Sequence, residues 1–358
     1  MGDCLQLGQD IPYAGEQPSG KFRVVPTVAV IVLNWNGWKD TVRCLASLVE
    51  HDYPRLSIVL VDNGSTDESV VRIKDWVSHC TLLNKVTFVG GEQTRTTARA
   101  AKEESWRALT LIVNGENVGF SAGNNIGLDY VLGAGLACDS VLFLNNDCVV
   151  KPNCIRRLVH ASSNGSAVAY AFQVDETGVE RFAIQKSSFP KLIYLLSPFV
   201  GWSHEYSAKE DVIEVDWVGG AALLLNMRVV ETLLRQDGYV WRPDYFLYCE
   251  DDELSFRLRK KGVKMMVPLD AVVEHRSHSF GSKRRLYYTI RNRFHLIRDH
   301  FGVVGRWVCI PLVGFISLTA VVKTMIKGNH SDARLRILAI TDGVMGRRGR
   351  KEHFSMSE

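Results

Sequence analysis

Short, uninterrupted apolar runs that end in polar residues recur along the first half of the chain. They cover residues 28–33, 57–61, 109–113 and 141–144, with a weaker run at 86–89. Runs of this length suit strands that are buried on both faces of a mainly parallel sheet. A helical stripe follows the first run, where Val42, Leu45 and Leu48 recur at helical spacing within residues 38–50. This alternation predicts βαβ units and an α/β fold.

The polar residues that follow these runs are the first candidates for chemistry. They are Asn34, Asn36, Asp62, Asn63, Ser65, Asn145, Asn146 and Asp147. In open α/β sheets, ligands bind beyond the carboxyl ends of the strands, so we expect these side chains to share one edge. Asp147 can hold a hard cation together with the phosphates of a substrate. The other interpretation of Asp147 is a simple strand-ending turn. Ser65 or Thr66 is predicted to cap the next helix.

Residues 114–125 contain three glycines and four asparagines, a composition that allows close backbone approach to a ligand and supplies amide hydrogen bonds. We expect a loop here and a helix over residues 126–132. The polar stretch at residues 90–107 is interpreted as an inserted surface loop or short helix. Residues 173–214 show little periodicity and are either the cover of a cleft or ordinary packing.

Four acidic residues, 250–253, follow an aromatic segment and begin a helix that Gly262 ends. Acids at a helix start interact favourably with its dipole. Crowded carboxylates also repel one another, which raises the pKa of one of them toward the value that a general base needs. His275 ends a short strand, where it is either structural or a metal ligand.

Composition narrows the classes of function. Apolar residues make up 46 % of the 358, enough for a large core, and the net charge of +4 does not by itself indicate nucleic acid binding. The eight cysteines form no C-x-x-C pair, which favours a reduced, cytosolic protein without a zinc site. No signal peptide or myristoylation pattern begins the chain. Because neither G-x-G-x-x-G nor a P-loop occurs, a dinucleotide dehydrogenase or P-loop enzyme is disfavoured.

The C-terminal part is basic and apolar. Residues 284–299 predict a basic, aromatic helix, and residues 307–322 are almost wholly apolar. At about 1.5 Å per residue the second stretch reaches ~24 Å, short of a ~30 Å hydrocarbon core, and Pro311 and Gly314 interrupt it. We expect this helix to lie in a membrane interface, with nearby basic residues meeting anionic headgroups. The alternative is a helix packed on the catalytic domain. The basic residues are Arg334, Arg336, Arg347, Arg348, Arg350 and Lys351.

Taken together, these segments resemble the inverting glycosyltransferases of family 2 with the GT-A fold, particularly their rhamnosyltransferase-like branch. Five motifs occur in the family's order over residues 28–282, with a weaker resemblance to residue 349. They are Leu33-Asn34-Trp35-Asn36-Gly37, Val61 to Asp67, Glu116 to Phe120 with Gly123-Asn124-Asn125, Asn145-Asn146-Asp147, and Glu250-Asp251 ahead of His275.

The resemblance implies roles for these residues. Asp147 and His275 would bind Mg²⁺ or Mn²⁺, with Asn145 standing for the first Asp of the family's metal motif. Asp251 would be the base and Glu250 its acidic neighbour. Glu253 stands where the family usually has Asp, which bears on acceptor recognition. The residues expected to bind the donor are Asn34, Asn36, Asp62, Asn63, Ser65, Asn117, Gly119, Phe120, Asn124, Asn125, Asn145, Asn146, Trp217, Gly219 and Gly220.

The expected protein is a GT-A α/β enzyme with a Rossmann-like, mainly parallel sheet and a C-terminal helical, membrane-proximal extension. Residues 1–27 form a tail, 28–283 the glycosyltransferase domain and 284–358 the helical region. It would move a hexose or deoxyhexose from a nucleoside-diphosphate sugar to a glycan or lipid-linked saccharide, at the cytoplasmic membrane face. The alternatives are a nucleotidyltransferase and a non-catalytic sugar-nucleotide binding or membrane scaffold protein.

Overall fold

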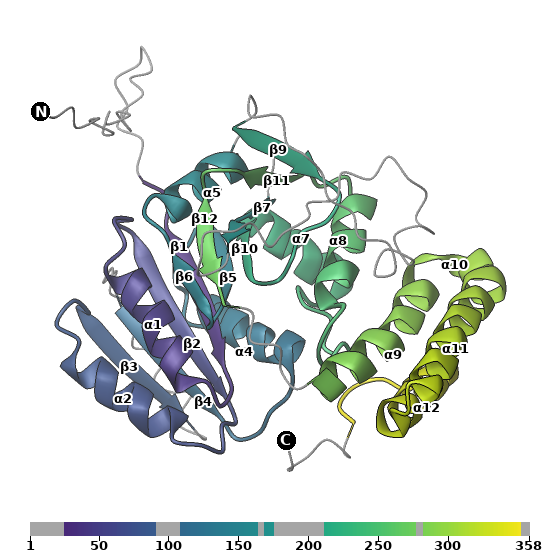
Figure 1. Ribbon diagram of the computed structural model, residues 1–358. Coiled ribbons are helices and arrows are strands. Elements are labelled where there is room, and N and C mark those ends of the chain that lie inside the picture. Colours follow the sequence, from purple (N-terminus) through teal and green to yellow (C-terminus); the bar gives the residue numbers. More distant parts are fainter. Residues whose placement is uncertain (1–24, 91–107, 164–167, 175–210, 277–281, 352–358) are drawn as a thin grey trace, which may run out of the picture.

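The computed structural model describes residues 25–90, 108–163, 168–174, 211–276 and 282–351 (Figure 1). Most of the predicted N-terminal tail, nearly all of the predicted insertion at residues 90–107 and most of residues 173–214 lie outside these ranges.

The centre of the protein is a nine-stranded sheet with the order β3-β4-β2-β1-β5-β10-β7-β11-β9. The strands from β3 to β5 in this order are parallel, whereas β10 is antiparallel to both of its neighbours. The predicted α/β fold with a mainly parallel sheet is confirmed. The bounds are β1 (Val28–Asn34), β2 (Leu56–Asn63), β3 (Lys85–Gly90), β4 (Ala108–Asn114), β5 (Ser140–Asn145), β7 (Val168–Tyr170), β9 (Val212–Val215), β10 (Ala222–Asn226) and β11 (Met265–Pro268).

Helices cover both faces of this sheet, which explains why its central strands are apolar throughout. In β1, Val28, Val30 and Val32 pack into one core, and Ala29 and Ile31 pack into the other. The first core is closed by α1 (Trp38–Val49), α2 (Ser69–His79) and α5 (Cys154–Ser163). The second is closed by α4 (Phe120–Gly133), α7 (Met227–Asp237) and α8 (Glu250–Lys260).

A small second sheet lies at the carboxyl end of β5. Its strands are β6 (Cys148–Val150), β12 (Val272–His275) and β8 (Phe172–Val174), with β12 in the middle. β12 and β6 are antiparallel, and their register pairs His275 with Cys148. The second sheet therefore brings a residue from late in the chain to the turn that follows β5.

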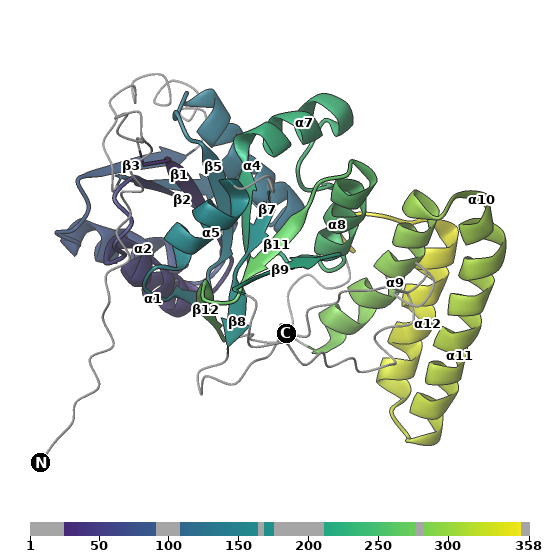
Figure 2. The same ribbon diagram turned by 90° about the horizontal axis from the view of Figure 1, so that it is seen from above.

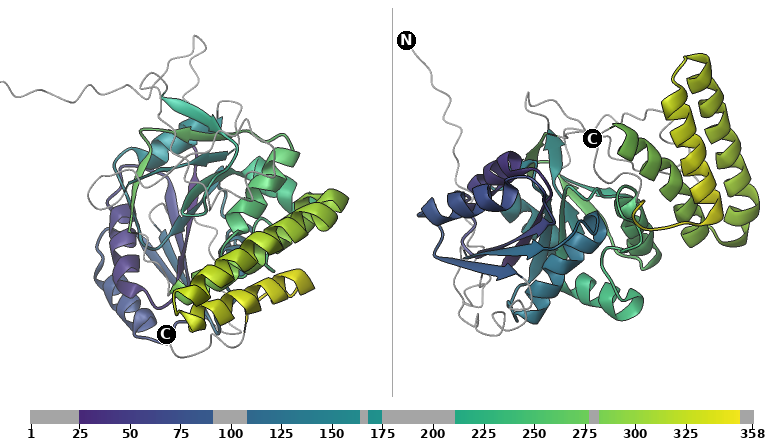
Figure 3. Two further views of the ribbon diagram at one scale, coloured as in Figure 1. Left: turned by 45° about the vertical axis from the view of Figure 1, so that its right-hand side comes forward. Right: turned by 90° about the horizontal axis from the view of Figure 1, so that it is seen from below.

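The C-terminal helices form a module beside the sheet (Figures 2 and 3). α9 (Ser282–His300) lies against the sheet domain, and α11 (Ile310–Ile326) and α12 (His330–Met345) pack together on its outer side. A short helix α10 (Gly302–Val304) and a π-helical turn η4 (Gly305–Cys309) join α9 to α11. Tyr287, Phe294 and Ile340 belong to the apolar core of this module.

The predicted interruption of the apolar helix is wrong. Gly302–Ile326 is one helix of 25 residues with a mean hydropathy of 1.9, and 22 % of its most apolar window is buried. At about 1.5 Å per residue it reaches ~37 Å, so length does not prevent it from crossing a membrane. In a regular α-helix the ring of Pro311 would clash with the carbonyl four residues earlier, which lies in η4. The π-helical turn η4 is wider than an α-helical turn, and it therefore accommodates the proline.

Two further local predictions are corrected. α4 begins at Phe120 instead of residue 126, so the second half of the predicted loop is helical. Neither Ser65 nor Thr66 caps α2, which begins at Ser69. The backbone N–H of Ser69 instead donates to the carboxylate of Asp67 (2.9 Å), because the Ser65 hydroxyl is bound to Asp62.

Candidate active site

The carboxyl ends of β1 and β2 meet through a buried set of hydrogen bonds. Asn34 Nδ2 and Ser65 Oγ both donate to Asp62 Oδ2 at 2.7 Å. Thr41 Oγ1 donates to Asn34 Oδ1, also at 2.7 Å. Asn34 and Asp62 have no exposed surface. These bonds fix the floor of a site whose rim carries the exposed side chain of Asn36.

The Asn117 loop is tied to β2 by Asn63. Asn63 Nδ2 donates to Asn117 Oδ1 (3.2 Å) and to the carbonyl oxygen of Gly119 (3.1 Å). The backbone N–H of Gly119 donates to Asn117 Oδ1 at 2.9 Å. The predicted residues of the first three motifs are thus brought together at one edge of the sheet.

Gly119 lets this loop approach the segment that precedes α8. Its φ is +89°, and a Cβ placed there would lie 2.3 Å from the carbonyl oxygen of Phe246. The same carbonyl accepts a hydrogen bond from the backbone N–H of Phe120 (2.8 Å). Asn125 strengthens the junction, since its side chain donates to and accepts from the backbone of Trp241 at 2.6 and 3.1 Å. Asn124 is buried and donates to the carbonyl of Phe120 (3.0 Å).

The turn after β5 brings together three groups that can hold a metal ion. Ligand atoms of Asp147, Cys148 and His275 all lie within 4.8 Å of one another. His275 Nε2 is 3.2 Å from Asp147 Oδ1, a buried oxygen that accepts no hydrogen bond within the described residues. Asn146 faces away from this cluster and donates to Thr41 Oγ1 (2.9 Å), which ties the turn to the floor of the site.

Not every member of the cluster is a good ligand for a hard cation. Burial raises the pKa of the Cys148 thiol well above its ordinary value, and the nearby Asp147 carboxylate raises it further. A protonated thiol is a poor ligand for Mg²⁺ or Mn²⁺, which prefer oxygen. Cys148 Sγ instead lies 3.6 Å from the carbonyl of Ala221. The carboxylate of Asp147 and the imidazole of His275 therefore fit such an ion, with room for substrate oxygens.

Glu250 and Asp251 lie at the N-terminus of α8, where the pKa of each carboxyl is raised. Burial raises the pKa of Asp251 to about 7, and the charge of Asp252 adds to this effect. The pKa of Glu250 is raised well above its ordinary value, first by burial and then by Asp251. Hydrogen bonds from the backbone N–H groups of Asp252 and Gly220 partly offset the shift of Asp251. Asp251 therefore changes its ionisation near neutral pH.

Two residues before α8 adopt left-handed backbone conformations, which the sequence pattern does not reveal. The φ angles are +64° at Tyr248 and +67° at Cys249. Such conformations are costly for residues with a side chain and occur where surrounding contacts impose them. Here the buried Asn292 side chain on α9 donates to the carbonyls of Leu247 and Tyr248 at 2.9 and 2.7 Å. α9 thus holds the turn that aims Glu250 and Asp251.

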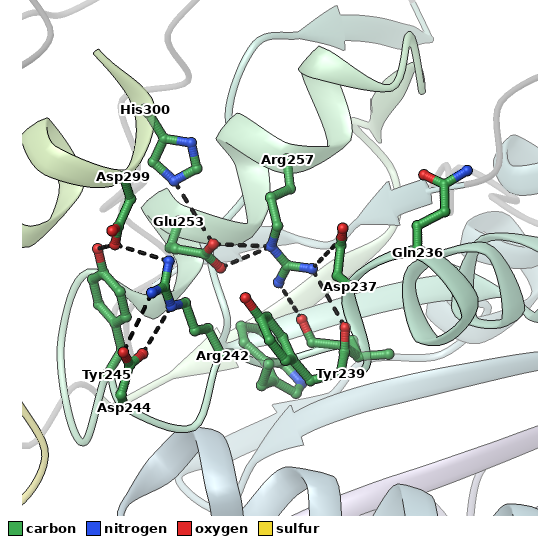
Figure 4. A network of polar contacts seen from close by, with 12 residues as sticks. Gln236, Asp237, Tyr239, Arg242, Asp244, Tyr245, Glu253, Arg257, Asp299 and His300 are labelled. Atoms are coloured by element: carbon green, nitrogen blue, oxygen red, sulfur yellow. Dashed lines mark hydrogen bonds and ion pairs between the residues drawn. The ribbon is translucent and has the colours of Figure 1, made fainter. Parts of the chain in front are cut away.

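A buried network of charges fixes α8 on its other side (Figure 4). Glu253 is 1 % exposed and accepts from Arg257 Nε at 2.9 and 3.0 Å. Arg257 Nη1 also pairs with Asp237 at 3.0 Å. Arg242 in the preceding loop pairs with Asp299 on α9 at 2.9 Å. Glu253 is therefore engaged in an internal ion pair that positions the helix.

The Gly219–Gly220 segment runs between the metal-ligand turn and Asp251. The backbone N–H of Asn145 donates to the carbonyl of Ala221 (2.8 Å), while the N–H of Gly220 approaches the Asp251 carboxylate. Trp217 begins this segment and is half-buried. This segment thus links the two chemical centres through its own backbone groups, while the side chains of Phe120 and Trp241 lie 3.3 to 3.4 Å from where a Cβ of Gly220 would stand.

Comparison with known proteins gives consistent results. Residues 26–295 match the family model described as "Glycosyltransferase like family 2". The chain is 24 % identical over 339 residues to the low-salt glycan biosynthesis hexosyltransferase Agl10 of Haloferax volcanii, covering 91 % of this chain and 94 % of that protein. It is 26 % identical over 194 residues to the rhamnosyltransferase WbbL of Escherichia coli K12, covering 51 % and 69 %.

Among solved structures, the fold is similar to that of the mannosyltransferase PcManGT from Pyrobaculum calidifontis in complex with GDP-Man and Mn²⁺. The TM-score is 0.52 at 15 % identity, over 90 % of this chain and 88 % of that one.

Proposed function

The chain belongs to glycosyltransferase family 2 and is a sugar-transferring enzyme with a GT-A-like fold, and we propose that it moves a hexose or deoxyhexose from a nucleoside-diphosphate sugar to a hydroxyl of a glycan or lipid-linked saccharide. The names of its relatives, a hexosyltransferase and a rhamnosyltransferase, support this range of donor sugars. We further propose residues 28–283 as the catalytic domain and residues 284–358 as the helical region.

The donor is proposed to bind across the ends of β1, β2 and β4. The rim residue Asn36 and the Asn117 loop are available to the base and ribose, whereas Asn34, Asp62, Asn63 and Ser65 form the hydrogen-bonded floor beneath them. Phe120, Asn124, Asn125, Asn145 and Asn146 shape the pocket from behind, and Trp217, Gly219 and Gly220 line the sugar end.

Asp147 and His275 are proposed to hold Mg²⁺ or Mn²⁺. When bound, such an ion stabilises the negative charge that develops on a nucleoside-diphosphate leaving group. The neighbour of known structure was solved with Mn²⁺, which supports a divalent cation without deciding between the two. The buried Oδ1 of Asp147, which lies 3.2 Å from His275 Nε2 and accepts no hydrogen bond from the described residues, supports the same assignment, since an ion would satisfy it.

Asp251 is proposed to take the proton of the acceptor hydroxyl. A pKa of about 7 leaves much of it ionised at neutral pH and still basic enough to accept a proton. Glu250 is buried beside it, and burial together with the charge of Asp251 raises the pKa of Glu250 well above its ordinary value, so the two carboxyl groups do not ionise independently. A single base with in-line attack by the acceptor would invert the anomeric centre. The configuration of the product therefore tests this mechanism, because a retained configuration would require a covalent intermediate on an enzyme nucleophile.

The C-terminal module is proposed to contact a membrane surface from the cytoplasmic side. Trp307, Phe315 and Ile326 are 67 to 80 % exposed. α11 packs on α12, which carries Asp332, Arg334 and Arg336, so a crossing of the pair would bury several charges in hydrocarbon. An interfacial position satisfies both helices, with the apolar side of α11 in the headgroup region.

The observation that carries the proposal is the Gly219–Gly220 segment, with the Asp147 turn on one side and the Asp251 carboxylate on the other. The test is a panel of nucleotide-sugars scored for Mn²⁺-dependent hydrolysis and for protection against thermal unfolding. We expect one donor class to give both effects. If no nucleotide-sugar raises the melting temperature or is hydrolysed, the proposed function is wrong.

A further inference from the structure

The segment that follows α12 runs back toward the sheet domain (Figure 1). We term residues 347–351 the C-terminal strap. Its residue Arg350 donates from Nη1 to the carbonyl oxygen of Asn117 at 3.3 Å. Among the described residues, no carboxylate lies within 4 Å of the Arg350 guanidinium, which is exposed. A cation is thus held at the pocket by a segment outside residues 26–295, which match the family model.

The strap is fixed at both ends by one buried carboxylate. Asp342 on α12 has no exposed surface and pairs with Arg347 Nη1 at 2.9 Å and with Lys351 Nζ at 2.7 Å. Between these ends, the carbonyl of Gly349 accepts from Arg291 Nη1 at 2.7 Å. Because the backbone on both sides of Arg350 is held, the strap needs no further backbone ordering for this side chain to bind a ligand.

The strap also contacts the loop that leads to the base. The backbone N–H of Gly349 donates to the carbonyl of Asp244 (3.1 Å). Arg348 bridges the carboxylates of Asp244 and Asp299 at 3.0 and 2.7 Å. The position of the strap beside the Asn117 loop is therefore fixed by Asp244 and Asp299, which also pair with Arg242 in the loop before α8.

Two further guanidinium groups lie near the strap. Arg284, in the first turn of α9, lies over the ring of Trp35, with Cζ 4.9 Å from the ring centroid. Arg291 lies over the ring of Tyr288, with Cζ 4.7 Å from its centroid. Burial raises the pKa of Tyr288, and the charges of Arg291, Arg284 and Arg350 act against this rise, so all three cations are close enough to act on one phenol.

This charge has a ligand of matching chemistry. A nucleoside diphosphate is an anion, and the floor of the pocket already carries the carboxylates of Asp62 and Asp147. Guanidinium groups form strong, charge-assisted hydrogen bonds to phosphate oxygens. A cationic wall also raises the local concentration of an anionic ligand. Arg350 is the member of the group that contacts the pocket loop, through the carbonyl oxygen of Asn117.

We propose that Arg350 binds a phosphate oxygen of the donor nucleotide, so that the C-terminal strap forms one wall of the donor site. This inference rests on the proposed function. It gives the helical module a part in donor recognition besides its proposed contact with the membrane.

The test compares a charged ligand with its uncharged counterpart. UDP, GDP and dTDP are titrated into the full chain with Mn²⁺ by calorimetry, and the tightest ligand is chosen along with its nucleoside. For Arg350→Gln we expect the Kd of the diphosphate to rise about tenfold, ~1.4 kcal/mol, with the Kd of the nucleoside changed less than about twofold. Arg350→Lys should recover part of the loss, and added salt should weaken the parent more than Arg350→Gln.

Arg334→Gln is the matched control, because it removes the same charge from an exposed position on α12. It should bind the diphosphate as the parent does. An unchanged diphosphate Kd in Arg350→Gln overturns the inference, as does an equal loss for nucleoside and diphosphate, which would place Arg350 at the base. If the parent binds none of the diphosphates, the proposed function itself fails.

Discussion

The imidazole Nε2 of His275 lies 3.2 Å from Oδ1 of Asp147, although His275 ends a strand of the small sheet and Asp147 lies in the turn between β5 and β6. The antiparallel pairing of β12 with β6 sets this distance, because it places His275 opposite Cys148, the residue after Asp147. The pair is the centre of the proposed metal site, and the first prediction addresses it.

Asp147→Asn should abolish most Mn²⁺-dependent turnover, because an amide is a weak ligand for a hard cation. Calorimetric binding of Mn²⁺ in the presence of the nucleoside diphosphate should weaken by more than about tenfold, ~1.4 kcal/mol. Asp270→Asn is a suitable control, since that half-exposed carboxylate pairs with Arg157 and has no part in the proposed metal site. Equal metal-dependent turnover in Asp147→Asn and the parent would remove Asp147 from the site.

Asp251→Asn should lower kcat by about 10²- to 10⁴-fold, because it retains the shape of the side chain and removes its basicity. The Kd of the donor should change less than about threefold, since the proposed donor contacts do not use this carboxylate. In the parent, kcat/KM should rise with pH through about 7 and then level off. Glu250→Gln should be less damaging. The reverse order of damage would exchange the two roles.

The same substitution should change stability in a pH-dependent way. The pKa of Asp251 is about 7 in the folded protein, whereas an unfolded aspartate has a pKa of about 3.9. Between these values the folded state binds a proton that the unfolded state has released, so the carboxylate lowers the free energy of unfolding as pH rises. Asp251→Asn should therefore be more stable than the parent at pH 8 and nearly equal to it near pH 4. Urea unfolding at both pH values measures this, and a pH-independent difference would contradict it.

The exposed apolar surface of η4 and α11 should account for membrane contact. Replacing Trp307, Phe315 and Leu318 together by Ser should release the protein from anionic phosphatidylglycerol vesicles in sedimentation, because these side chains are 51 to 79 % exposed. Soluble donor hydrolysis should persist. Val71→Ser is the control, since Val71 is equally exposed on α2. Side-chain replacement is preferable to deleting residues 306–358, which would also remove the C-terminal strap. If the triple variant pellets like the parent, the contact lies elsewhere.

Gly119→Ala should destabilise the protein more than Gly135→Ala. Both glycines have positive φ angles, +89° and +63°, which cost an alanine roughly 1–2 kcal/mol. Only at Gly119 would the new Cβ also meet the Phe246 carbonyl, and such overpacking adds about 1–3 kcal/mol. Urea unfolding of the two variants isolates the second effect. Equal losses would mean that the Phe246 segment moves aside freely.

The strands and the polar residues at their ends could be predicted because both signals are local. The start of α4 could not, because Asn and Gly disfavour helices and packing overrides this preference. Gly123 and Gly127 face Leu33 and Ile31 of β1, where an added Cβ would lie 2.6 Å from a side-chain carbon. The spacing of Gly119, Gly123 and Gly127 by four residues was the signal that would have indicated a helix pressed against a strand.

Other parts of the site depend on contacts between distant segments. The left-handed turn at Tyr248 and Cys249 exists because Asn292 binds the carbonyls before it, and no local preference predicts it. The C-terminal strap likewise reaches Asn117 only through the fold of the helical module. The basic residues of the strap were assigned to headgroups from composition alone, which does not reveal that Arg347 and Arg348 pair with internal carboxylates.

The hydrogen bond from the N–H of Phe120 to the carbonyl of Phe246 (2.8 Å) joins the start of α4 to the loop that leads to Asp251. A ligand that stiffens one side of this bond therefore stiffens the other, and the second ligand meets a segment that is already ordered. Coupling of this kind is reciprocal, so a bound nucleotide-sugar should tighten the acceptor and a bound acceptor should tighten the nucleotide-sugar by the same factor. Initial-velocity lines should then intersect, and the apparent KM of each substrate should fall as the concentration of the other rises.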